Sequence, residues 1–204
     1  TGNRLTDGRK RKIMTVAVLA LQGAFAEHEN VLKRLGVDCI ELRQAKDLET
    51  PYDGIILPGG ESTVQGKLLK ELGMFDTIKE QIENGMPVLA TCAGLILLAS
   101  EVDGQEGCHF GTIPMCVRRN AYGRQLGSFH TIREMKGIGQ VPMTFIRAPY
   151  IEKCGEGAEV LAEVDGNIVA VKYKKQYGLA FHPELDEDDR IHRAFLDSAV
   201  AYEE

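Results

Sequence analysis

Short apolar segments alternate with segments of helical periodicity over the first half of the chain. Residues 15–21 form an apolar run of the length of a buried strand, and the next segment repeats its core-facing side chains at helical spacing. The residues on this stripe are Phe25, His28, Val31, Leu32 and Leu35. We therefore expect a strand, a turn at Gln22-Gly23 and an amphipathic helix that ends at Gly36.

The same alternation continues to residue 92. Residues 37–42 and 54–57 predict two further strands. Residues 71–84 predict a helix that stops at Gly85, and Pro87 begins another apolar strand. Strands that alternate with helices are typical of a parallel sheet covered on both faces.

The pattern changes after residue 101 to short segments rich in β-branched and aromatic residues. These segments are residues 113–118, 144–146, 160–164, 168–173 and 177–181. Asp165-Gly166-Asn167 predicts a hairpin turn, so we expect antiparallel strands in the C-terminal half. Acidic residues 186–189 precede a last helix, whose stripe is Ile191, Phe195, Ser198 and Tyr202. For residues 103–111 and 128–141 the sequence predicts neither a helix nor a strand.

Composition and charge exclude several classes of protein. The chain has 204 residues, 44% of them hydrophobic, and a net charge of −6. Residues 1–13 are basic, with a net charge of +4, which leaves −10 on the rest and disfavours nucleic-acid binding. We expect residues 1–13 to be a leader or a disordered tail. Without a membrane-spanning run or a signal-peptide pattern, the sequence predicts a soluble, cytoplasmic protein.

Cysteine and histidine spacing gives no sign of a metal site or a disulfide framework. The five cysteines include no Cys-x-x-Cys pair, so neither structural zinc nor disulfides are expected. Four histidines also lack the spacing of metal ligands, and we expect each of them to pack in the interior or to lie on the surface: His28, His109, His130 and His192. We expect no cofactor.

Cys92 is the candidate nucleophile. A short apolar strand ends at Thr91, and a helix is expected to begin at Ala93-Gly94, so the thiol is raised on a tight turn that resembles a nucleophile elbow. The positive end of the helix favours the thiolate, which is the form that attacks a carbonyl carbon. The small side chain of Ala93 allows a substrate carbonyl to approach backbone N–H groups.

His182-Pro183-Glu184 supplies a candidate base and a candidate orienting acid. Residues two apart on an extended chain point to the same side, so His182 and Glu184 are expected to face one another. His182 would move protons while Glu184 holds its tautomer, which gives a Cys-His-Glu triad. The alternative is a buried cysteine and an unrelated histidine, but the presence of both motifs favours the triad.

Two further features lie at predicted strand ends. The glycines of Pro58-Gly59-Gly60 follow a strand and can present N–H groups to an oxyanion, although an ordinary turn with a helix cap has the same pattern. A phosphate-binding loop is excluded, since Leu68 stands where a hydroxyl is required. Arg119 and Arg147 can each hold a substrate carboxylate or lie on a solvated rim.

Six motifs distributed along the chain carry a family resemblance. From Met14 onward the sequence resembles the glutaminase subunits of pyridoxal 5′-phosphate synthase, which are class I glutamine amidotransferases. The motifs are Leu21-Gln-Gly23, Pro58-Gly-Gly-Glu-Ser-Thr63, Thr91-Cys-Ala-Gly-Leu-Ile96, Arg119-Asn-Ala-Tyr-Gly-Arg-Gln125, Phe145-Ile-Arg-Ala-Pro149 and Phe181-His-Pro-Glu-Leu185. The resemblance implies one flavodoxin-like α/β domain over residues 14–204. Its sheet would be mixed and mostly parallel, flanked by helices, with antiparallel strands in the C-terminal half.

The resemblance also implies roles for individual residues. Cys92 would attack the side-chain amide of L-glutamine and form a thioester, with His182 and Glu184 completing the triad. Gly60 and Ala93 would donate the oxyanion N–H groups, and Gln22 would help to complete that site when a partner docks. The residues implied to bind glutamine are Gly59, Gly60, Glu61, Arg119, Ile146 and Arg147.

The partner implied by the resemblance is a (β/α)₈-barrel synthase subunit in a hetero-oligomer. It would receive ammonia through a channel and use it to make pyridoxal 5′-phosphate, the active form of vitamin B6. Two alternatives remain at this point: a glutaminase subunit for another biosynthetic amidotransferase, and a catalytically silent binding module on the same fold. The intact triad motifs argue against the second alternative.

Overall fold

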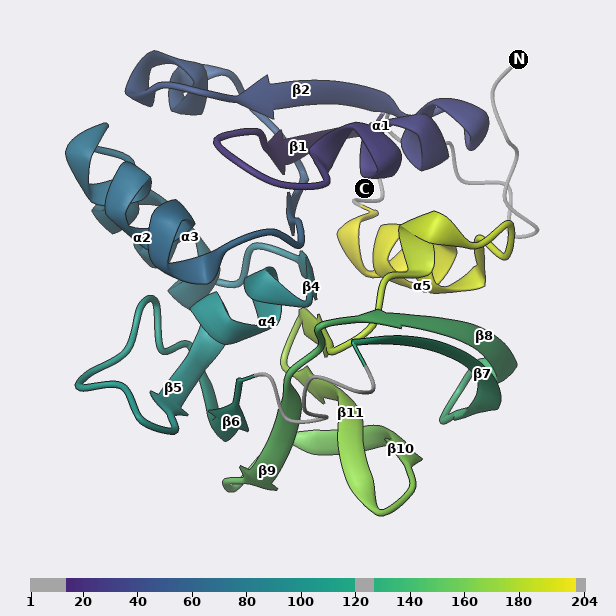
Figure 1. The fold of residues 1–204 in the computed structure, drawn as a ribbon. Helices are drawn as coiled ribbons and strands as arrows, with labels where there is room; N and C mark the ends of the chain where they lie inside the picture. Colours follow the sequence, from purple (N-terminus) through teal and green to yellow (C-terminus); the bar gives the residue numbers. More distant parts are fainter. Residues whose placement is uncertain (1–13, 120–126, 201–204) are drawn as a thin grey trace.

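Strands and helices alternate along the computed structural model, which describes residues 14–119 and 127–200 (Figure 1). The strands are β1 (Thr15–Leu19), β2 (Asp38–Leu42), β3 (Gly54–Leu57), β4 (Val88–Thr91), β5 (Ala99–Val102), β6 (Ile113–Arg118), β7 (Ser128–Met135), β8 (Gly139–Ile146), β9 (Tyr150–Cys154), β10 (Glu159–Val164), β11 (Asn167–Tyr173) and β12 (Gln176–Leu179). The helices are α1 (Phe25–Arg34), α2 (Ser62–Glu71), α3 (Phe75–Glu83), α4 (Ala93–Leu98) and α5 (Arg190–Ala199), with short 3₁₀ helices η1 (Ala45–Glu49) and η3 (Pro183–Leu185).

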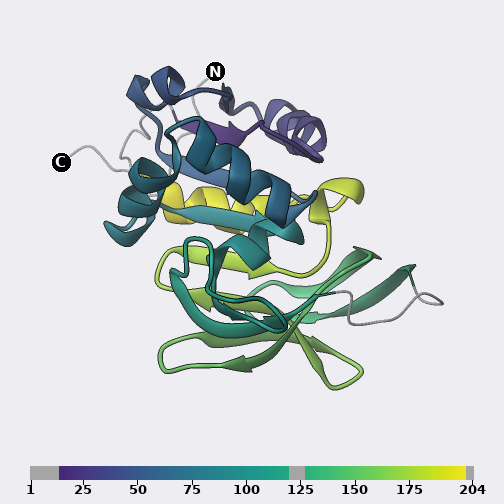
Figure 2. The same cartoon turned by 60° about the vertical axis from the view of Figure 1, so that its left-hand side comes forward.

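All the described strands except β7 and β8 join one mixed sheet. Its order is β2-β1-β3-β4-β12-β11-β9-β6-β5, with β10 paired to β11. The strands from β2 to β12 in this order run parallel, whereas β11, β9 and β6 follow in antiparallel pairs. Figure 2 shows the antiparallel strands, in green, below the helix-covered parallel strands. The expected mostly parallel α/β fold, with antiparallel strands in the C-terminal half, is confirmed.

Helices cover both faces of the parallel strands. Figure 1 shows α1 and α5 together on one side and α2 and α3 on the other. Packing is close: a Cβ placed on Gly54 of β3 would lie 2.9 Å from the ring of Phe195 on α5. Within residues 14–119 and 127–200, no helix combines the length and the apolar character needed to cross a bilayer.

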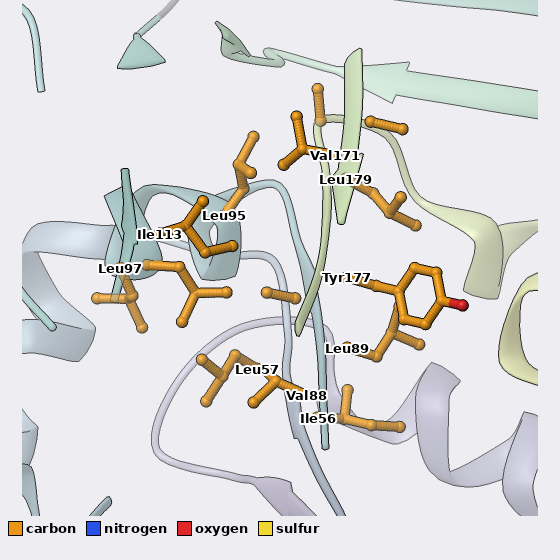
Figure 3. Close-up of a cluster of buried hydrophobic side chains, with 14 of the residues drawn as sticks. Ile56, Leu57, Val88, Leu89, Leu95, Leu97, Ile113, Val171, Tyr177 and Leu179 are labelled. Carbon is orange, nitrogen blue, oxygen red and sulfur yellow. The ribbon is translucent and has the colours of Figure 1, made fainter. Parts of the chain in front are cut away.

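The core spans both halves of the sheet. Strands β3 and β4 are buried along their whole length, because helices lie on both of their faces, and they therefore read as continuous apolar runs. Figure 3 shows one part of this core, where side chains of the parallel strands meet Leu95 and Leu97 of α4, Ile113 of β6 and Val171 of β11. This packing fixes α4, and hence the residue just before it, against the sheet.

The helix expected over residues 71–84 is α3, which begins only at Phe75, and the helix before it, α2, was not predicted. Gly73 ends α2 with φ +70°, a left-handed conformation that glycine adopts without strain. Its N–H donates to the Lys70 carbonyl (3.1 Å), and the Met74 N–H donates to the Leu69 carbonyl (2.9 Å), which is the pattern of a Schellman cap. The Leu72-Gly73 pair was the sequence signal for this break.

Residues 128–141, which predicted no element, form most of the β7-β8 hairpin. Strands β5 and β9 were also not predicted. The hairpin lies outside the main sheet, and most residues of β7 are exposed or half-buried, so the strand lacks a strong apolar alternation. The basic residues 1–13 and Tyr202 of the last predicted stripe lie outside the described residues.

Gly94→Ala is expected to destabilise the fold. A Cβ at Gly94 would lie 2.1 Å from the Leu57 carbonyl oxygen, so α4 would have to move away from β3. We expect a loss of about 1–3 kcal/mol in the free energy of unfolding, measured by urea denaturation. Gly127→Ala is the control, because no atom of the described residues, chain neighbours apart, lies within 4 Å of a Cβ there. Equal stability of the two variants would contradict the close approach.

Candidate active site

Cys92 lies on a strained turn between β4 and α4. Its φ of 50° and ψ of −103° are unusual for a residue with a side chain, and the surrounding structure holds them in place. The Cys92 N–H donates to the Leu179 carbonyl of the neighbouring strand β12 (2.8 Å). The expected nucleophile elbow is therefore the geometry that the chain adopts.

His182 and Glu184 contact one another, but not by the expected route. His182 Nδ1 lies 2.5 Å from Glu184 Oε1. The chain there is not extended: Pro183 begins the 3₁₀ helix η3, and the Leu185 N–H donates to the His182 carbonyl (3.3 Å). The prediction of an extended segment was wrong, because the fixed φ of proline also suits the first position of a helical turn.

The neighbouring strands β4 and β12 bring the histidine to the cysteine. They are parallel, with Thr91 paired to Leu179, so the residues that follow them emerge at the same edge of the sheet. The His182 N–H donates to the Thr144 carbonyl of β8 (2.8 Å), which ties the turn to the hairpin. The Cys92 thiol donates to the Ile146 carbonyl (3.9 Å) and interacts electrostatically with the His182 side chain.

Burial and charge set the protonation of this pair. Burial opposes the charge on His182, but hydrogen bonds to Cys92 and Glu184 outweigh it and raise the pKa of His182 to about 10. Burial also opposes the charge on Glu184, yet the imidazoles of His28 and His182 lower the pKa of its carboxyl group. At neutral pH the site therefore contains an imidazolium and a carboxylate.

A cavity of about 1200 Å³ opens over Cys92. It brings together ten of the eleven predicted site residues, from elements far apart in the sequence: Gln22, Gly59, Gly60, Glu61, Cys92, Ala93, Arg119, Ile146, Arg147 and His182. Glu184 is the exception, and it lies buried behind His182. The cavity is large enough for an amino acid and is lined by groups of both charges.

The Gly59-Gly60 turn is held by the segment after β1. The Gly59 carbonyl accepts from the Ala24 N–H (3.0 Å), and Gln22 Oε1 accepts from the Glu61 N–H (2.7 Å). A Cβ on Gly59 would lie 2.5 Å from the His182 ring, so only glycine fits beside the triad. Gln22 thus contacts the turn that carries the predicted oxyanion donor Gly60.

Gln65 is a site residue that the sequence did not reveal. It is fully buried on α2, and its amide donates to the carbonyls of Pro58 (3.2 Å) and Gln22 (3.1 Å). It thereby joins the two segments of the turn from behind. One polar residue in a helical pattern gives no sign that it faces inward, so no sequence signal distinguished it.

The two predicted arginines flank the cavity differently. Arg119 donates to Thr63 Oγ1 (3.3 Å) and to Gln105 Oε1, which fixes its guanidinium. Arg147 is exposed, with φ 45°, and its N–H donates to the Gly127 carbonyl (2.5 Å). Both residues line the cavity, and a guanidinium group there can meet an anionic substrate group.

The remaining histidines do not form a metal centre. In the part of the chain that the structure describes, no group of three or more His, Cys, Asp or Glu residues is placed to hold a metal ion. His130 lies 3.4 Å from Asp186 at the surface. His28 and His192 are fully buried and hydrogen-bonded to one another.

A cysteine, a histidine and a carboxylate at the carboxyl edge of a mostly parallel sheet are the arrangement of a cysteine-dependent amidotransferase. The chain belongs to the SNO glutamine amidotransferase family, which matches it over residues 18–201.

Relatives and solved structures agree with this family. Pyridoxal 5′-phosphate synthase subunit PdxT of Desulfitobacterium hafniense (strain Y51) is 62% identical over 185 residues, covering 91% of this chain and 93% of the relative. The PdxT subunit of Streptococcus pneumoniae (strain ATCC 700669 / Spain 23F-1) is 54% identical, covering 90% of this chain and 96% of the relative. A crystal structure of a glutamine amidotransferase aligns with a TM-score of 0.86 at 46% identity, covering 90% of this chain and 98% of its own.

Proposed function

We propose that this chain is the glutaminase subunit of a pyridoxal 5′-phosphate synthase. It hydrolyses L-glutamine to L-glutamate and ammonia and delivers the ammonia to a synthase subunit. The observation that carries the proposal is the contact of Cys92, His182 and Glu184 beside the cavity, in a chain 62% identical to a PdxT subunit. The family membership fixes the reaction class.

The proposed reaction proceeds in two steps. The Cys92 thiolate attacks the side-chain carbonyl carbon of glutamine, and protonated His182 gives its proton to the departing nitrogen, so ammonia leaves a thioester behind. Neutral His182 then removes a proton from water, which attacks the thioester and expels the Cys92 thiolate, so that protonated His182 and the thiolate are both restored; the new carboxyl group loses its proton to water and leaves as glutamate. Glu184 stays ionised and orients the imidazole throughout.

The cavity supplies positions for the other predicted roles. The N–H groups of Ala93 and Gly60 are the proposed donors to the oxyanion. Arg119 and Arg147 are proposed to bind the α-carboxylate, because guanidinium groups pair with carboxylates. Gly59, Glu61 and Ile146 complete the proposed glutamine site. Gln22, already bonded to the turn, is proposed to complete the oxyanion site on docking.

The proposed partner is a (β/α)₈-barrel synthase subunit that docks over the cavity mouth in a hetero-oligomer and receives ammonia through a channel. Exposed apolar side chains support a protein contact there: Ile146 is 40% exposed and Leu185 44% exposed, and both line the cavity. We also propose a cytoplasmic location. The five cysteines are all free, which fits a reducing compartment.

The test of this function is glutamate release from glutamine by the purified chain, with and without a pyridoxal 5′-phosphate synthase barrel subunit. We expect release that the barrel subunit stimulates. Release without stimulation would keep the chemistry and reassign the chain to another biosynthetic amidotransferase. No release in either case would identify a silent binding module.

Arg147→Lys is expected to raise the KM for glutamine while changing kcat little. Lysine keeps the charge but loses the bidentate fork, and about 1–3 kcal/mol of charged hydrogen bonding is involved, which corresponds to roughly a 5- to 150-fold rise. Steady-state kinetics of the complex measure it. Arg118→Lys is the matched control, because Arg118 pairs with Asp103 (3.2 Å) and Glu152 (3.3 Å) outside the cavity. An unchanged KM for Arg147→Lys would place this arginine on a solvated rim.

A further inference from the structure

A buried histidine faces the side of Glu184 that the triad does not use. Glu184 Oε1 contacts His182, and its second oxygen, Oε2, lies 3.5 Å from Nε2 of His28 on α1. The same Nε2 lies 3.2 Å from Thr91 Oγ1. The side chains of His28 and Glu184 have no exposed surface, so water does not compete for these contacts.

A second buried histidine stands behind the first. His192 on α5 is fully buried, and its Nε2 lies 3.0 Å from Nδ1 of His28. A continuous polar chain therefore runs from α5 through α1 to the triad, in the order His192, His28, Glu184, His182. The other buried side chains of α1 and α5 are apolar. Two adjacent buried imidazoles among them call for an explanation, because buried polar groups are normally retained only where they are hydrogen-bonded.

The carboxylate selects the tautomer of both rings. Nε2 of His28 is hydrogen-bonded to Thr91 Oγ1, and Glu184 Oε2 lies nearby without a hydrogen bond of its own. An ionised carboxyl group attracts an N–H dipole and only accepts hydrogen bonds, so it favours the tautomer with the proton on Nε2. His28 Nδ1 then accepts, and His192 Nε2 donates to it. The unpartnered nitrogen, His192 Nδ1, is left as a bare acceptor, which costs less than a buried N–H without a partner.

The two rings are neutral dipoles and not charges. Burial lowers the pKa of His28, and burial together with His28 lowers the pKa of His192 to about 3. The ionisable groups around His28 are Glu184, His182 and Glu27, and those around His192 are His28, Glu184, Arg34 and Asp189. A neutral N–H donor such as His28 can hold the Glu184 carboxylate without adding a second positive charge that would compete with protonated His182 for the negative charge of Glu184.

We propose that His28, aligned by His192, is a positioning residue that holds the Glu184 carboxylate in register with His182. The inference rests on the proposed glutaminase function of the triad. His28 does not line the cavity, and it contacts Glu184 and Thr91 rather than the reacting atoms. Carboxylate and imidazole must stay aligned for the proton transfers, and a misplacement of about 1 Å can lower a rate about 100-fold.

Two substitutions of His28, by amide side chains of different length, distinguish a positioning role from a packing role. In His28→Gln the amide nitrogen can occupy the place of Nε2 and donate to Glu184. In His28→Asn the amide is one bond shorter and reaches only the place of Nδ1. With the barrel subunit present, we expect the Asn variant to lose about 10- to 100-fold in kcat, with KM within about twofold of the wild type. The Gln variant should stay within about fivefold of the wild-type kcat.

A second readout reports on the triad without turnover. The pH dependence of Cys92 alkylation by iodoacetamide follows the thiolate, which the aligned imidazolium stabilises. We expect its midpoint to rise in the Asn variant and to stay near the wild-type value in the Gln variant. The proposal would be overturned if the two variants had equal kcat values and equal alkylation midpoints, and if their losses of activity followed their melting temperatures. His28 would then contribute only to packing.

The wild-type protein provides a test that needs no variant. Nitrogen-15 NMR of the His28 ring distinguishes the two tautomers, and the proposal requires the proton on Nε2. A proton on Nδ1 would overturn it. Failure of the proposed function is a separate result: the wild type would then release no glutamate with any synthase, while the tautomer and the alkylation midpoint would still report on His28.

Discussion

Cys92→Ala is expected to abolish glutamate release while leaving binding to the barrel subunit intact. The thiol forms the bond that defines the first step, and no neighbouring group can replace it, so the loss should reach about 10⁴-fold or more in kcat. Alanine also fits the site, because Cys92 is buried and its turn is held by the Leu179 carbonyl. Glutamate release and co-elution with the barrel subunit measure the two properties.

Cys116→Ala is the matched control for this variant. Cys116 is also buried, but it lies on β6 and contacts Glu152 (3.7 Å), outside the cavity. It should keep wild-type turnover. Normal turnover by Cys92→Ala would contradict the assignment of the nucleophile, and loss of turnover by both variants would point to a defect in folding.

Cys92 and His182 were singled out in the sequence because each follows a short apolar segment within a motif. Apolar runs and glycine or proline breaks marked β4 and the end of β12, but the parallel pairing of these two strands, which brings Cys92 and His182 to one edge of the sheet, was not predicted. The family motifs then supplied the residues on the loops. Ten of these residues line one cavity.

What the sequence did not predict depends on packing between distant segments. The contact of His28 with His192 spans 164 positions and exists only because α1 and α5 lie on the same face of the sheet. In the sequence His28 is one member of an amphipathic stripe, and His192 lies outside the stripe expected for the last helix. The 3₁₀ turn at Pro183 was missed for another reason: proline permits both the extended and the helical continuation, and the hydrogen bond of His182 to the Thr144 carbonyl comes from another strand.

Glu184→Gln is expected to lower kcat by about 10²- to 10³-fold, less than Cys92→Ala, because an orienting residue contributes through the base and not through a bond to substrate. The substitution keeps the size and an acceptor oxygen but removes the negative charge. That charge and its hydrogen bond help to raise the pKa of His182 to about 10. In the variant the pKa of His182 should fall toward its usual range.

This shift has a definite sign in the pH profile. His182 must be protonated to give its proton to the departing amide nitrogen, so activity is lost as the pH rises through the pKa of His182. With Glu184 that loss comes in the region of pH 10; with glutamine the alkaline limb of kcat/KM should move to lower pH. Glu187→Gln, the same change at an exposed position three residues away, is the control and should leave the limb in place. An unmoved alkaline limb in Glu184→Gln would show that the carboxylate does not set the protonation of His182, and the raised pKa would then have to come from Cys92.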